Sequence, residues 1–206
     1  MAAGKLITIE GIDGAGKTTL AAGLAGELAA RGIEVQALRE PGGVHAAERI
    51  RKLVSDPDLR IGARAEALLY AAARAQLVDE ALRPLLRGGT WVLLDRFVDS
   101  SLAYQGGGRE LGIDAVRDVN EFAIRGLRPD RTLLLTIAPE LGRSRSNERG
   151  APPDRLEREQ EDFFKRTAAV YQELSAQDPE RIRTIDATRP PEQVLAAAVD
   201  ALADLL

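Results

Sequence analysis

The sequence predicts an α/β fold in which a parallel sheet is covered by helices on both faces, and three observations support this. Apolar segments of strand length alternate with longer helical patterns, which indicates βαβ units. Residues 91–94 form a continuous apolar run before an aspartate, which is typical of a strand buried on both faces. A glycine-rich loop, residues 11–18, follows the first strand and precedes a helix. In such sheets the functional site lies at the carboxyl ends of the strands.

The expected elements follow one another regularly along the chain. The first strand covers residues 5–10, and the helix over residues 17–30 stops at Gly32, because glycine favours the left-handed conformation that ends a helix. A long alanine-rich helix is expected over residues 63–86. The other expected strands are residues 33–38, 91–94, 133–137 and, with a weaker pattern, 181–185.

Length and composition indicate a single globular domain over residues 1–206. Hydrophobic residues make up 45% and charged residues 29% of the chain, as in ordinary globular proteins. The net charge of −4 gives no general attraction to nucleic acid or to an anionic membrane. The sequence contains no cysteine and only one histidine, His45, which excludes disulfides and argues against a zinc site. It shows no signal peptide and no apolar run that could span a bilayer, so we expect a cytoplasmic protein.

The glycine-rich loop matches the phosphate-binding pattern G-x-x-x-x-G-K-[ST]. It consists of Gly11, Ile12, Asp13, Gly14, Ala15, Gly16, Lys17 and Thr18. Its glycines let backbone N–H groups close on phosphate oxygens, and the helix N-terminus adds a partial positive charge. Lys17 is expected to reach the β- and γ-phosphates, and the Thr18 hydroxyl to hold Mg²⁺. The loop therefore predicts a nucleoside triphosphate with Mg²⁺.

Asp13 is the unusual member of this loop, because a carboxylate beside a triphosphate is repelled. We expect its side chain to point away from the phosphates, toward an acceptor hydroxyl or a metal-bound water. The alternative is an aspartate that is simply solvated in a loop.

Two further segments follow predicted strands. Asp95 ends the strand at residues 91–94, where an acid beside a phosphate loop orients Mg²⁺ or its water ligands. The adjacent Arg96 suits bidentate capture of a second phosphate, although an ordinary Asp–Arg surface pair is the alternative. Glu40 and Pro41 lie in a Pro-Gly-Gly loop after the second strand, and we expect them to face the same cleft as Asp13.

Residues 142–158 are rich in arginine and are interrupted by glycine and proline. This composition predicts a mobile lid whose arginines neutralise charge on a transferring phosphoryl group. The candidates for that role are Arg145, Arg149 and Arg155. The alternative is a solvated helix face with charge pairs four residues apart.

Taken in order, these segments resemble the thymidylate kinase family over most of the chain. The resemblance rests on the phosphate loop, on Arg-Glu-Pro-Gly-Gly at 39–43, on Tyr-Ala-Ala-Ala-Arg at 70–74, on Asp-Arg-Phe at 95–97, on Ser-Ser-Leu-Ala-Tyr-Gln-Gly at 100–106, and on Asp-Arg-Leu-Glu at 154–157. It implies a P-loop nucleoside monophosphate kinase fold with five parallel strands and a homodimer. It also implies transfer of the ATP γ-phosphate to dTMP with Mg²⁺, giving dTDP and ADP in dTTP synthesis.

The resemblance also implies roles for single residues. Asp13 would meet the sugar 3′-hydroxyl, and Arg96 would hold the dTMP phosphate. Tyr70 would stack on thymine and Arg74 would bond its edge, while the nucleoside pocket would be lined by Ser101, Tyr104 and Gln105. In this family the catalytic arginine lies either in the phosphate loop or in the lid. Because Gly14 fills the loop position here, the lid must supply it.

The acceptor needs no strong base under this interpretation, because a phosphate monoester with a second pKa near ~6 is largely a dianion at neutral pH. A deoxynucleoside kinase, which phosphorylates a 5′-hydroxyl, is the nearest alternative and would need a base such as Glu40. A P-loop switch or regulatory ATPase is a second alternative, but no N-K-x-D stretch for guanine is present. A set of residues suited to a nucleoside pocket has no use in such a switch.

Overall fold

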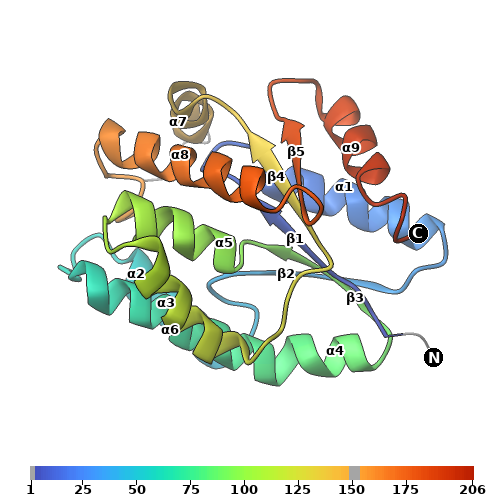
Figure 1. Cartoon of the computed structure of the whole chain (residues 1–206), viewed down its shortest axis with the longest axis horizontal. Helices are drawn as coiled ribbons and strands as arrows, with labels where there is room; N and C mark the ends of the chain where they lie inside the picture. Colours follow the sequence, from blue (N-terminus) through green and yellow to red (C-terminus); the bar gives the residue numbers. More distant parts are fainter. Residues whose placement is uncertain (1–2, 149–153) are drawn as a thin grey trace.

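The computed structural model describes residues 3–148 and 154–206, apart from the side chain of Asn147. One sheet contains the strands β1 (Leu6–Glu10), β2 (Val35–Arg39), β3 (Trp91–Asp95), β4 (Arg131–Thr136) and β5 (Ile182–Asp186). The strand order is β2-β3-β1-β4-β5, and every pairing is parallel (Figure 1). The predicted fold class, a five-stranded parallel sheet flanked by helices, is confirmed.

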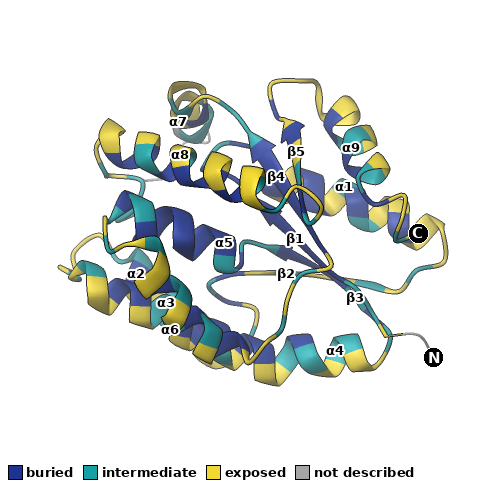
Figure 2. Ribbon diagram, in the orientation of Figure 1, coloured by how far each residue is buried: buried dark blue, intermediate teal, exposed yellow. Residues whose placement is uncertain are grey.

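The central strands are buried on both faces, as Figure 2 shows for β1, β3 and β4. Side chains alternate along a strand, so Ile7 and Ile9 of β1 point to one face. There they pack in one apolar cluster with α1 (Lys17–Ala30) and α9 (Pro191–Asp200). Leu6, Thr8 and Glu10 consequently share the opposite face, where two of the three side chains are polar although all are fully buried.

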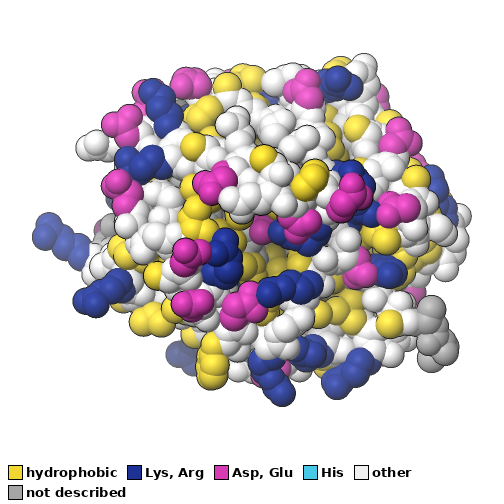
Figure 3. All heavy atoms as spheres, viewed as in Figure 1, with side chains coloured by type: hydrophobic (Ala, Val, Ile, Leu, Met, Phe, Trp, Pro, Cys, Tyr) yellow, Lys and Arg dark blue, Asp and Glu magenta, His cyan; other side chains and the backbone are white. Residues whose placement is uncertain are grey.

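The opposite face carries most of the remaining helical segments. They are α2 (His45–Ser55), α3 (Ala63–Leu77), η1 (Val78–Leu82), α4 (Arg83–Arg87), α5 (Val98–Ser101), η2 (Leu102–Gly108), α6 (Ile113–Ile124) and α8 (Glu161–Gln177), where η marks a π-helical turn. One apolar cluster joins η1 to β1 and β3, and a second joins η2 to α8 and β4. On the face seen in Figure 3, basic and acidic side chains are interspersed.

The observed boundaries differ from the predicted ones for local reasons. The second strand begins at Val35 and not at Ile33, because the Ile33 N–H bonds the Leu28 carbonyl. Gly32, with φ +78°, supplies the left-handed residue of that helix ending. The long helix predicted over residues 63–86 is interrupted by the wider turn η1. Pro84 lies two residues after η1, and proline has no N–H to donate to a regular helix.

The predicted lid is partly helical. Helix α7 (Pro139–Glu148) includes the first seven residues of the segment 142–158. Residues 149–153, among them Arg149, lie outside the described part of the chain. Within the described residues, no helix has both the length and the apolar character needed to cross a bilayer.

Candidate active site

The phosphate loop lies between β1 and α1, at the carboxyl edge of the sheet. Gly14 and Gly16 adopt φ values of +79° and +95°, a region that side chains disfavour. A Cβ at Gly14 would also lie 2.0 Å from the Gly142 carbonyl oxygen of α7. The loop therefore has no room for a side chain at position 14, arginine included. Within the loop, Gly11, Ile12 and Ala15 are buried, and Ile12 and Ala15 pack in the apolar core.

Lys17 and Thr18 are the first two residues of α1, directly after the loop. The Lys17 ammonium donates to the carbonyls of Gly11 and Ile12 at 3.1 and 3.0 Å, so it curls over the loop. Burial, and then the charge of Arg96, lower the pKa of Lys17 to about 8. A phosphate anion bound in the loop would counter both effects and favour the charged ammonium.

The end of β3 supplies the acid expected near the loop. The Thr18 hydroxyl donates to Asp95 Oδ2 at 3.2 Å, whereas Asp95 Oδ1 is buried and has no hydrogen-bond partner among the residues that the structure describes. A buried carboxylate oxygen without a donor is costly unless a cation or water binds it. Mg²⁺ prefers oxygen ligands, and one carboxylate and one hydroxyl, completed by phosphate oxygens and waters, would supply them. These residues therefore fit a magnesium ion.

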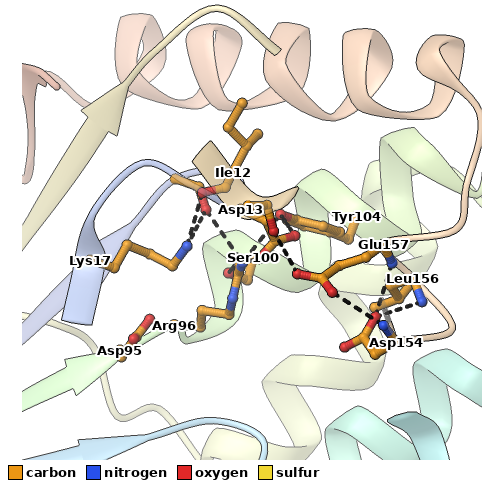
Figure 4. Close-up of polar contacts among 12 residues, drawn as sticks. Ile12, Asp13, Lys17, Asp95, Arg96, Ser100, Tyr104, Asp154, Leu156 and Glu157 are labelled. Atoms are coloured by element: carbon orange, nitrogen blue, oxygen red, sulfur yellow. Dashed lines mark hydrogen bonds and ion pairs between the residues drawn. The ribbon is translucent and has the colours of Figure 1, made fainter. Parts of the chain in front are cut away.

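Arg96 and Asp13 form the centre of the site (Figure 4). Arg96 Nη2 lies 2.6 Å from Asp13 Oδ1, and the Tyr104 hydroxyl donates to Asp13 Oδ2 at 3.0 Å. The Arg96 guanidinium also stacks over the Tyr104 ring, 4.9 Å from its centroid. Burial raises the pKa of Asp13, but the charges of Arg96 and Lys17 outweigh this and hold that pKa at about 2. Asp13 is thus held in its ionised form, with its carboxylate bonded to Arg96 and Tyr104.

Two adjoining cavities meet at this ion pair. A cleft of about 980 Å³ is lined by Lys17, Thr18 and Asp95, and also by Arg145. A second pocket brings together the predicted acceptor residues Asp13, Glu40, Pro41, Tyr70, Arg74, Arg96, Ser101, Tyr104 and Gln105. Asp13 and Arg96 line both cavities. The two cavities therefore share the Asp13–Arg96 ion pair as part of their walls.

Arg74 is more deeply buried than its predicted role requires. Its exposed fraction is 2%, and it donates to Glu40, Ser101, Asn120 and the Phe97 carbonyl. Its Nη2 also lies 2.6 Å from Glu40 Oε2. A base edge would have to share N–H groups that these partners already use. Burial raises the pKa of Glu40, although the charge of Arg74 opposes this rise. The contact with Arg74 holds Glu40 at the pocket wall.

Glu66 is a site residue that the sequence analysis missed. It is fully buried, and its carboxylate accepts Gln105 at 2.9 Å and Arg109 at 3.0 Å. Arg155 of the predicted lid lies 2.6 Å from the same carboxylate. The signal was present, because Glu66 precedes Tyr70 and Arg74 at four-residue intervals along one face of α3.

The described lid candidates have different surroundings. Arg145 lies at the phosphate cleft and donates to the Ala187 carbonyl at 2.9 Å. Arg155 instead lies 2.6 Å from the Glu66 carboxylate and donates to the Val54 carbonyl at 2.9 Å. Asp154 caps the turn that follows it, because its Oδ1 accepts the Leu156 and Glu157 N–H groups.

Comparison with known proteins gives one consistent family. The thymidylate kinase family model matches residues 9–198. A thymidylate kinase of Rhizorhabdus wittichii is 48% identical over 98% of this chain and 99% of its own length. Thymidylate kinases of Halorhodospira halophila and Bacillus pumilus are each 44% identical over 98% of this chain, covering 95% and 97% of their own lengths.

The buried contacts of Arg74 predict a loss of stability on its removal. Arg74→Ala should lower the free energy of unfolding by about 3–5 kcal/mol, because it leaves the Glu40 carboxylate buried without its partner. Arg64→Ala, on the exposed side of the same helix, is the control and should change it by less than about 0.5 kcal/mol. Chemical denaturation measures both, and equal effects would contradict a structural role for Arg74.

Proposed function

The chain belongs to the thymidylate kinase family, and we propose that its two adjoining cavities hold the two substrates of that reaction. The enzyme transfers the γ-phosphate of ATP to dTMP, giving dTDP and ADP. ATP takes the cleft beside the phosphate loop, and dTMP takes the pocket lined by Tyr70 and Arg74. The observation that carries this assignment is that Asp13 and Arg96 line both cavities. The donor and acceptor phosphates would therefore meet at that ion pair.

The residues of the chain work by positioning and by neutralising charge. Lys17 and the N–H groups of the loop bind the ATP phosphates, and Arg96 holds the dTMP phosphate in line with them. Asp13 keeps Arg96 oriented, and its second oxygen is directed by the Tyr104 hydroxyl toward the sugar side of the pocket. No general base is needed, because the dTMP phosphate is already largely a dianion at neutral pH.

Magnesium completes the donor side in this proposal. Thr18 and Asp95 would hold Mg²⁺, directly or through its water ligands. When bound, the ion would neutralise the negative charge that builds up on the phosphate oxygens. Asp95 thereby acts as a metal-organising acid.

The acceptor pocket would select a deoxythymidine nucleotide. Tyr70 offers a ring for stacking, which is worth roughly 1–3 kcal/mol per base. Arg74 and Ser101 both line the pocket and are joined by a hydrogen bond, and this part of the wall would exclude the second ring of a purine. Tyr104, held by Asp13, would crowd a 2′-hydroxyl, and Gln105 is fixed by Glu66 at the pocket edge.

The alternative activities are disfavoured by particular contacts. A deoxynucleoside kinase would need a free base, but Glu40 is paired with Arg74. A regulatory ATPase would have no use for the pocket lined by Tyr70 and Ser101. A cytoplasmic location remains a prediction from the sequence.

The lid would supply the cation that the phosphate loop lacks. Of the described candidates we assign this role to Arg145, because it lines the cleft that contains Lys17. Arg155 would instead fasten the lid segment to Glu66 and so cover the acceptor. Arg149 lies outside the described residues and remains a candidate for the same catalytic role.

A homodimer would cover apolar surface on α3 and α6, which pack against each other. Phe122 of α6 is 88% exposed, and Leu68 of α3 is 57% exposed. The small residues Ala65 and Ala72 lie on the exposed side of α3 with Leu68, at intervals of three and four residues. Exposed apolar side chains with small neighbours suit close packing between two copies.

Arg96 and Lys17 give the first test of this function. Arg96→Ala should raise KM for dTMP on the order of 30- to 150-fold, because it removes a charge-assisted phosphate contact, and should change KM for ATP little. Lys17→Ala should nearly abolish turnover but leave dTMP binding intact. Steady-state assays with dTMP and with thymidine as acceptors measure both effects. An Arg96 variant that affects only ATP would refute the acceptor assignment.

The lid assignment is tested with alanine at each arginine in turn. Arg145→Ala should lower kcat by about 100-fold or more, whereas Arg155→Ala should act mainly on KM for dTMP. Arg143→Ala is the control. Arg143 lies on the same helix as Arg145, but its guanidinium lies over the Phe164 ring. If Arg149→Ala alone abolishes transfer, the catalytic role belongs to Arg149 and not to Arg145.

Sedimentation at micromolar concentration tests the homodimer. The unmodified protein should sediment as a dimer, and Phe122→Asp should sediment as a monomer because it places a charge in the apolar contact. Leu141→Asp, at an exposed apolar position on α7, should leave the dimer unchanged. A monomeric unmodified protein would exclude the proposed interface.

A further inference from the structure

Glu10 is a fully buried acid to which the proposed mechanism assigns no task. It ends β1, immediately before the phosphate loop, and its side chain points to the face covered by α5 and α8. Four donors converge on its carboxylate. They are the Phe97 N–H at 2.7 Å, the Ser100 N–H at 3.3 Å, the Ser100 hydroxyl at 2.5 Å and the Tyr171 hydroxyl at 2.9 Å. An ionised carboxylate can accept all four, since it has acceptor sites only.

These bonds lead directly to Arg96. The Ser100 hydroxyl donates to Glu10 and accepts Arg96 Nη1 at 3.2 Å. The Phe97 N–H that Glu10 binds belongs to the residue after Arg96, whose φ is +72°. A non-glycine residue in that left-handed region is held there only by its surroundings. Glu10 therefore fixes both the backbone next to Arg96 and one partner of the guanidinium.

Charged groups of both signs lie around Glu10. The ionisable groups that face Glu10 are Arg96, Asp99 on α5, Lys17 on α1 and Tyr171 on α8. On β4, the residue paired with Glu10 is the apolar Leu134. Asp99 is itself paired with Arg181 at 2.7 Å. Burial and then Asp99 raise the pKa of Glu10 to about 7, against the lowering effects of Ser100 and Arg96. The carboxyl therefore changes charge close to neutral pH.

We propose that ionised Glu10 is a positioning residue for Arg96, and that the affinity for the acceptor phosphate depends on the charge of Glu10. This inference rests on the proposed role of Arg96 in binding that phosphate. Neutral Glu10 would carry an O–H that has to donate, and only the Ser100 and Tyr171 hydroxyls could accept it. Reversal at Ser100 would change the hydroxyl that accepts Arg96. Reversal at Tyr171 would free its O–H to donate to Ser100 Oγ, 2.9 Å away, and so would disturb the same partner of Arg96. Acceptor affinity should thus be full above the pKa of Glu10 and fall as the pH drops through it.

Glu10→Gln tests the proposal because glutamine has the shape of glutamic acid and stays neutral at every pH. Titration calorimetry of dTMP with the ATP-free protein gives the affinity across the pH range. The unmodified protein should bind dTMP about tenfold more tightly than Glu10→Gln at about pH 8.5, and equally at about pH 5.5. The titration of dTMP itself cancels in this ratio. A ratio that does not change with pH would overturn the proposal.

A second variant shifts the titration without removing the acid. Tyr171→Phe removes one donor to the carboxylate, so the pKa of Glu10 should rise and the fall in dTMP affinity should begin at a higher pH. An unmoved pH dependence would also overturn the proposal. Arg96→Ala separates this inference from the function on which it rests. If Arg96→Ala binds dTMP normally, the acceptor role of Arg96 fails; if it loses dTMP while the Glu10→Gln ratio is flat, only the role of Glu10 fails.

Discussion

The parallel pairing of β1 with β3 is the contact on which the rest of the site depends. Ile9 lies opposite Asp95 in this pairing, and the Arg96 N–H bonds the Ile9 carbonyl at 3.0 Å. The loop after β1 and the residues after β3 therefore leave the sheet side by side. Because the order β3-β1-β4 places both strands in the centre of the sheet, the phosphate loop and Arg96 rest on its most deeply buried part.

Charge balance is the second constraint, since the site concentrates ionisable groups in a poorly solvated place. Asp13 neutralises Arg96 on one side, while Glu10 reaches the same guanidinium through Ser100 on the other. The pKa values of the two acids shift in opposite directions. Arg96 and Lys17 hold the pKa of Asp13 at about 2, whereas burial raises the pKa of Glu10 to about 7. Under the proposed function, these two carboxylates would orient the Arg96 guanidinium for the acceptor phosphate.

Glu66 gives the acceptor side its own organisation. It joins α3, η2 and the lid segment through Gln105, Arg109 and Arg155. The helix that presents Tyr70 to the pocket is thus connected to the segment predicted as a lid. In this arrangement a buried carboxylate links lid and pocket, because leaving any of its partners unpaired would be costly in a buried position.

The sequence by itself determined the fold class, the phosphate loop and the family, because a strand, a glycine pattern and a helix are local signals. It also named nine residues that line one pocket of the structure. Tertiary structure decided what the side chains do there. Arg74 is directed into Glu40 and Asn120, and Glu10 and Glu66 become central, because their partners lie up to 161 residues away in the chain. Periodicity and motifs report neighbours along the chain, whereas burial and pairing of charge arise only when distant segments pack together.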